Sequence, residues 1–183
     1  MIEKQKKGEG AAVVSTVLFD NESVVIYDRL PLERVPRMTE REYYTRGCTA
    51  LLDAVGGAIH HIGNIHKYAR EEDRPQRTLF VITTDGMENA SRRYDYQKVK
   101  EMIERQKEKY GWEFLFLGAN IDAAKEAARF GISAERAANY HADHQGTGLV
   151  YEAVNAAVCA VRANCTLEND WRASIDKDFK GRK

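Results

Sequence analysis

The sequence predicts an α/β fold of three layers, in which helices cover both sides of a doubly wound, mostly parallel sheet with an antiparallel hairpin at its edge. Two continuous apolar runs, Thr78–Thr84 and Glu113–Leu117, are typical of strands that are covered on both faces. Segments with apolar residues at helical spacing alternate with these runs, and such alternation indicates a parallel sheet. A chain of 183 residues with 43% hydrophobic side chains is enough for about one domain with one core.

The individual elements follow from local signals. Val13–Phe19 and Ser23–Asp28 predict the hairpin, and residues 30–46 predict a long irregular connection that contains two prolines. We expect helices over 50–68, over 95–110 with Gly111 as C-cap, from the N-cap Asp122 to Gly131, and from Thr147 or Gly148 to Arg162. A faint signal at Ile132 predicts a short last strand. Residues 1–166 are expected to form the domain, and residues 167–183 a loosely held polar tail.

Composition narrows the classes of function. Lysine and arginine together number 28, and aspartate and glutamate together also number 28, so the formal net charge is zero. A protein that binds nucleic acid or an anionic membrane would be expected to carry an excess of positive charge. The cysteines, Cys48, Cys159 and Cys165, show neither a CxxC pair nor an even count, so neither a disulfide framework nor a zinc ribbon is predicted. No secretory signal and no apolar stretch of about 18 residues is seen, so we expect a cytoplasmic chain without a membrane span.

Two segments carry hard oxygen donors at positions where α/β proteins bind ligands. GCTALLDA, residues 47–54, opens the first long helix, and TTDGMENAS, residues 83–91, follows a buried strand. The hydroxyl of Thr49 and the carboxylate of Asp85 suit magnesium better than soft metals. Simpler roles stay open, because Thr49 could be an N-cap, Asp85 a turn residue and Asp53 an acid favoured by the helix dipole.

These segments resemble the two corresponding motifs of the von Willebrand factor A (VWA) domain family, and the similarity runs from about Val13 to Arg162. GCTALLDA is similar to the threonine motif, and TTDGMENAS to the aspartate motif, of that family's metal-ion-dependent adhesion site. Residues 111–114 and 118–122 extend the likeness to small bacterial and phage VWA proteins. The family's DxSxS motif and the central strand before it have no counterpart here. The resemblance places that strand between 13–19 and 78–84.

The resemblance implies a protein-binding module and not an enzyme. Thr49 and Asp85 would be the metal ligands, and the loops 45–49, 85–91 and 118–122 would form a rim that receives an acidic side chain of a partner protein. The rim residues are Gly47, Gly86, Glu88, Asn89, Ser91 and Asn120. Because only two protein oxygens with one charge remain, Mg²⁺ is expected to bind weakly at best.

The missing strand leaves three explanations open: a natural start upstream of Met1, a sheet that has closed up, or a strand donated by another chain. We expect the first. The alternative function is a metal-independent structural or assembly protein with a vestigial site, for example a homodimer that closes the sheet. A third interpretation, a magnesium-dependent hydrolase, fails because the sequence has no nucleophilic aspartate and no phosphate-binding lysine in the required positions. A zinc site at His141, Asp143 and His144, and an anion loop at 146–148, are weaker interpretations than simple loops.

Overall fold

The structure is a computed structural model that describes residues 1–39 and 47–182. The predicted connection over 30–46 therefore lies partly outside the described residues. The described strands are β1 (Val13–Phe19), β2 (Ser23–Pro31), β3 (Leu79–Thr84), β4 (Glu113–Ala119) and β5 (Ala137–Tyr140). The described α-helices are α1 (Ile2–Gln5), α2 (Leu51–Tyr68), α3 (Tyr96–Tyr110), α4 (Ala123–Arg129), α5 (His144–Arg162) and α6 (Ala173–Gly181).

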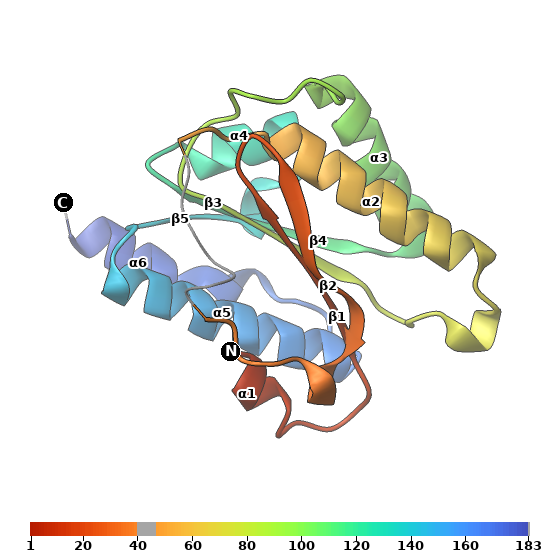
Figure 1. Ribbon diagram of the computed structural model, residues 1–183. Coiled ribbons are helices and arrows are strands. Elements are labelled where there is room, and N and C mark those ends of the chain that lie inside the picture. The colour runs from red at the N-terminus through yellow and green to blue at the C-terminus, as the bar shows by residue number, and fades with distance from the viewer. Residues whose placement is uncertain (40–46, 183) are drawn as a thin grey trace.

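The strands form two separate sheets within the described ranges (Figure 1). One is parallel with the order β3-β4-β5, and Leu79 to Thr84 pair in register with Glu113 to Gly118. The other is the antiparallel hairpin of β1 and β2. The mixed α/β class with a parallel sheet is confirmed. The hairpin was expected as an edge of the same sheet, and it stands as a sheet of its own in the described part.

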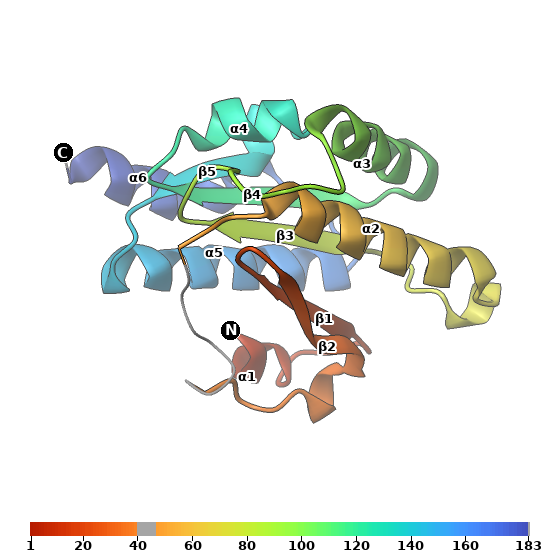
Figure 2. The same cartoon turned by 45° about the horizontal axis from the view of Figure 1, so that its top comes forward.

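Helices cover both faces of the parallel sheet, with α2, α3 and α4 on one side and α5 on the other (Figure 2). The central strand β4 explains why both faces need cover, because its successive side chains point in opposite directions. Phe114 and Phe116 pack into the core under α2, α3 and α4, while Leu115 and Leu117 pack into the core with α5 and α6. All four side chains are at most 2% exposed.

Aspartates set the starts of three helices. The side chains of Asp95, Asp122 and Asp143 each accept a hydrogen bond from the backbone N–H of the third residue of the helix. The predicted N-cap Asp122 is confirmed, and so is the C-cap Gly111, which has φ 64° in the left-handed region. The prediction that the last long helix opens at Thr147 or Gly148 is wrong, since Asp143 caps it and residues 146–148 are helical.

The last strand also differs from expectation. Ile132 lies in no strand but is buried in the core beside Phe130, and β5 begins five residues later at Ala137. The β5 sequence, AANY, has little intrinsic strand preference. Pairing of Ala137 to Tyr140 with Phe116 to Ala119 therefore determines this strand, and such pairing cannot be recognised locally.

The chain after Glu168 is helical and packed, where the sequence predicted a loosely held tail. Trp171 and Ile175 are buried against α5, and Trp171 Nε1 donates a hydrogen bond to the carbonyl of Glu135 at 2.8 Å. Arg172 donates to the carbonyl of Ala134 at 2.7 Å. Trp171 just before α6 and Ile175 within it are the buried apolar anchors of this short helix, and Phe179 stacks on the ring of His141. Among the residues described, no helix is long and apolar enough to cross a membrane.

Candidate functional site

The candidate site lies where β3 ends and α2 begins, on the side of the sheet where β3 and β4 have their carboxyl ends (Figure 2). A Cβ atom placed on Gly86 would lie 3.4 Å from Thr49 Oγ1, so the loop after β3 touches the residues before α2. Asn120, which follows β4 with φ 58°, donates from Nδ2 to the carbonyl of Asp85 at 3.4 Å. The two predicted motifs and the third loop of the predicted rim thus meet at one edge.

Glu88 supplies the cap that α2 lacks locally. The helix has Ala50 as N-cap, without a side-chain cap bond, so Thr49 is not the N-cap that one interpretation expected. Instead Glu88 Oε2 accepts the N–H of Leu52 at 2.8 Å and the hydroxyl of Ser91 at 2.8 Å. Its Oε1 accepts the N–H groups of Ala90 and Ser91 at 2.9 and 2.7 Å.

This bonding sets the charge state of Glu88. Burial alone would raise the pKa of its carboxyl, but the N–H donors favour the ionised form and hold the pKa below its usual value. Both carboxylate oxygens accept hydrogen bonds from other groups of the same chain. Glu88 therefore fixes the loop and is not offered to a ligand.

Asn89 and Ser91 have similar structural roles. Asn89 Oδ1 accepts the N–H of Thr49 at 2.9 Å, and the N–H of Asn89 donates to the carbonyl of Thr49 at 3.0 Å. Ser91 Oγ accepts the N–H of Asp53 at 3.0 Å. Three of the predicted rim residues thus bond to the backbone over 49–53.

Asp53 completes the connection in the opposite direction. Its carboxylate accepts the N–H groups of Arg92, Arg93 and Tyr94, each at 2.9 Å. Burial opposes ionisation, yet these three donors hold the pKa of Asp53 below its usual value. We name the reciprocal set of Asp53, Glu88, Asn89 and Ser91 the loop clamp.

Two predicted ligands stay outside the loop clamp. Within residues 1–39 and 47–182, neither Thr49 Oγ1 nor the Asp85 carboxylate makes a hydrogen bond or ion pair, and Asp85 is exposed. Gly47 is exposed as well, with open space around it. The free pair consists of two hard oxygen donors, which fits the donor preference of Mg²⁺. The number of donors predicts weak binding, and the described residues contain no group of three or more His, Cys, Asp or Glu suited to a metal ion.

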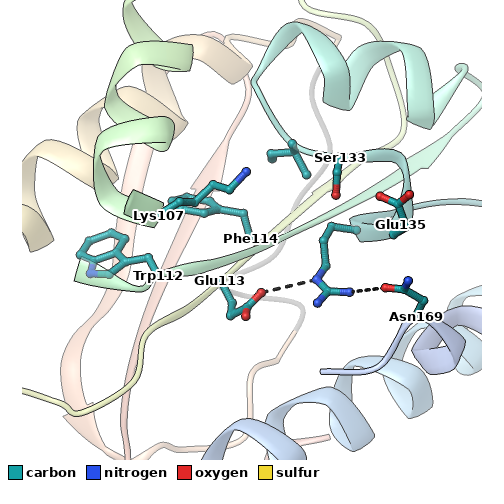
Figure 3. A pocket seen from close by; sticks show the side chains of 9 residues that line it. Lys107, Trp112, Glu113, Phe114, Ser133, Glu135 and Asn169 are labelled. Carbon is teal, nitrogen blue, oxygen red and sulfur yellow. Dashed lines mark hydrogen bonds and ion pairs between the residues drawn. The ribbon is translucent and has the colours of Figure 1, made fainter. Parts of the chain in front are cut away.

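A cavity of about 310 Å³ lies at the other end of β4, near its amino end (Figure 3). Three of its polar groups bond to other parts of the chain: Arg136 contacts Glu113 Oε2 at 3.4 Å and Asn169 Oδ1 at 3.0 Å, and Lys107 donates to the carbonyl of Gly131. The lining residues are Lys107, Trp112, Glu113, Phe114, Ile132, Ser133, Glu135, Arg136 and Asn169. This arrangement does not select a ligand charge.

Sequence reasoning missed the loop clamp. The bonds of Glu88, Ser91 and Asp53 join positions 36 to 41 residues apart, so no local pattern reveals them. The one available signal was the absence of a capping side chain at Ala50, which implies a cap from elsewhere.

No protein-family model, no curated protein and no solved structure matches the chain. The resemblance to the VWA family therefore stays a prediction from the sequence motifs.

Proposed function

We propose that the chain is a protein-binding module of VWA-like, three-layer design, which binds an acidic side chain of a partner protein at the edge formed by Thr49 and Asp85. The observation that carries the proposal is the contrast within the predicted site. The side-chain oxygens of Glu88, Asn89 and Ser91 already accept hydrogen bonds within the loop clamp. The Thr49 hydroxyl and the Asp85 carboxylate have no hydrogen-bond or ion-pair partner among the described residues. A rigid loop that presents two free oxygens suits binding, because little ordering entropy is lost on contact.

The charge of this edge indicates what else is needed. Asp85 alone would repel a partner carboxylate, whereas the Thr49 hydroxyl could donate to one. Thr49 and Asp85 are the residues that would hold a magnesium ion, which would supply the positive charge that an acidic partner requires. With one protein charge, affinity for Mg²⁺ alone is expected to be weak, on the order of millimolar.

A magnesium titration of thermal stability tests the proposal. A ligand that binds only the folded state stabilises it, and at ten times its dissociation constant the gain is about 1.4 kcal/mol, or roughly 3–6 °C. We expect this rise for the wild type and for Glu108→Ala, a control that removes an exposed carboxylate on α3. Asp85→Ala and Thr49→Ala should abolish the rise.

The loop clamp favours one alternative, a metal-independent structural or assembly protein with a vestigial site. In that case the hydrogen bonds around Glu88 would serve to hold α2 against the loop after β3, and the magnesium response would be flat in all four proteins. Light scattering then decides whether the chain assembles with itself.

A further inference from the structure

The cavity near the amino end of β4 lies at the opposite end of that strand from the loop clamp, and the proposed function does not use it (Figure 3). Its charged lining is balanced, with the cations Lys107 and Arg136 and the carboxylates Glu113 and Glu135. The volume of about 310 Å³ is at the lower end of the roughly 300–1,000 Å³ that is typical of small-molecule sites. We therefore expect a small ligand that carries little net charge.

Two of the four charges form an ion pair in the wall of the cavity. Arg136 Nε contacts Glu113 Oε2 at 3.4 Å, and the other guanidinium nitrogens donate to Asn169 Oδ1 at 3.0 Å and to the carbonyl of Leu167 at 2.7 Å. These three contacts fix the position of the Arg136 side chain. The charges of Lys107 and Glu135 therefore decide what the cavity can bind.

Lys107 and Glu135 line the same cavity with opposite charges that do not pair. Neither side chain forms an ion pair in the part of the chain that the structure describes. Lys107 Nζ donates to the carbonyl of Gly131 at 3.1 Å. The backbone N–H of Glu135 itself and the hydroxyl of Ser133 hold the pKa of the Glu135 carboxyl below its usual value, so this group is ionised at neutral pH. Figure 3 shows Lys107 on one side of the cavity and Glu135 on the other, with Ser133 between them.

Both charged side chains are attached to backbone that is well fixed. Glu135 belongs to the short 3-10 turn Ala134–Arg136, whose carbonyl groups accept hydrogen bonds from Arg172 at 2.7 Å and from Trp171 Nε1 at 2.8 Å. Lys107 is in the last turn of α3. A site on fixed backbone loses less conformational freedom when a ligand binds. The two charges are thus held in place before a ligand arrives.

We propose that this cavity binds a small zwitterion, namely an α-amino acid with an apolar side chain. Its carboxylate would accept hydrogen bonds from Lys107, and its ammonium group would donate to Glu135. Its side chain would rest against Phe114 and Ile132, which line the cavity as well. A ligand with only one of the two charges would leave either Lys107 or Glu135 partly desolvated without a partner, which opposes binding.

Titration of the ¹⁵N-labelled full chain with three related compounds tests the proposal. L-Leucine carries both charges, N-acetyl-L-leucine lacks the ammonium group, and L-leucinamide lacks the carboxylate. We expect leucine to shift the amide signals of residues 107, 112–114 and 131–136, and the two singly charged compounds to bind at least about tenfold more weakly. Equal binding of the three compounds, or no shift at these residues with leucine up to about 20 mM, would overturn the proposal.

Two variants assign the two charges separately. Lys107→Met should weaken leucine binding at least about tenfold and remove the preference for leucine over leucinamide, because the partner of the carboxylate is lost. Glu135→Gln should weaken binding to a similar extent and remove the preference for leucine over N-acetyl-leucine. Lys109→Met, at an exposed lysine of the same helix, should leave both preferences unchanged, and so should Asp85→Ala, which separates this proposal from the proposed function. A preference that persists in the variant expected to lose it would overturn the proposal.

Discussion

Glu88 caps a helix that begins far upstream of it: its Oε2 accepts the N–H of Leu52, 36 positions earlier in the chain, at 2.8 Å. Asp53, one residue further into the same helix, accepts three N–H groups from the loop that follows Glu88. Each segment thus satisfies the backbone donors of the other. This reciprocal bonding holds Thr49 against Gly86, and the candidate site depends on it.

Replacing Glu88 should loosen the start of α2. Glu88→Ala removes the remote cap and leaves the N–H groups of Leu52, Ala90 and Ser91 without an acceptor, so we expect the free energy of unfolding in urea to fall by about 1–2 kcal/mol. Glu88→Gln keeps one acceptor oxygen and should lose less. Glu108→Ala serves as the surface control. An unchanged urea midpoint for Glu88→Ala would show that the cap contributes nothing.

Stability should decline in acid because of the same two carboxylates. The pKa values of Glu88 and Asp53 are lower in the folded chain than their ordinary values, so the folded state favours ionisation. Their contribution is complete above about pH 5, and it is lost as the pH falls through the ordinary and then the lowered pKa values. Urea titrations from pH 7 to pH 3 should show a shallower decline for Glu88→Gln than for the wild type. Equal slopes would contradict this assignment.

Two adjacent glycines of α2 should respond in opposite ways to alanine. A Cβ on Gly56 would lie 2.6 Å from the ring of Tyr94, whereas one on Gly57 would meet no atom within 4 Å. Gly56→Ala should destabilise by about 1–3 kcal/mol through overpacking. Gly57→Ala should stabilise by roughly 0.5–1 kcal/mol through helix propensity. Similar melting temperatures for the two variants would contradict the packing of α2 on the loop at Tyr94.

Trp171 should hold α6 on the domain. It is 8% exposed, packs in the core on the α5 side and donates to Glu135. Trp171→Ala should cost about 3–5 kcal/mol and speed exchange over 173–181. Tyr151→Ala, at a residue that is 54% exposed on α5, should cost less than about 1 kcal/mol. Unchanged exchange in α6 would show that this helix is held by other contacts.

Elements with a strong local sequence pattern could be predicted from the sequence. Elements and hydrogen bonds that depend on contacts between distant parts of the chain could not. Val13–Phe19 was predicted with its observed bounds, and α3 ends at Tyr110, directly before the predicted C-cap Gly111. β5 and α6 were missed because Ala137 and Ala138 carry no strand signal and because two anchors in a polar segment look like a tail. Thr49 and Asp85 were placed in two motifs, and the structure brings those motifs together at Gly86. The tertiary roles of Glu88 and Asp53 were invisible, since their partners lie 36 to 41 positions away.

Paramagnetic broadening by Mn²⁺, used in place of Mg²⁺, most directly tests whether Thr49 and Asp85 form a cation-dependent edge. Amide spectra of the wild type should lose intensity first at residues 49, 85, 86 and 120, and Asp85→Asn should restore these signals at the same Mn²⁺ concentration. Broadening spread over surface carboxylates and identical in both proteins would contradict the claim that these two oxygens are a binding site.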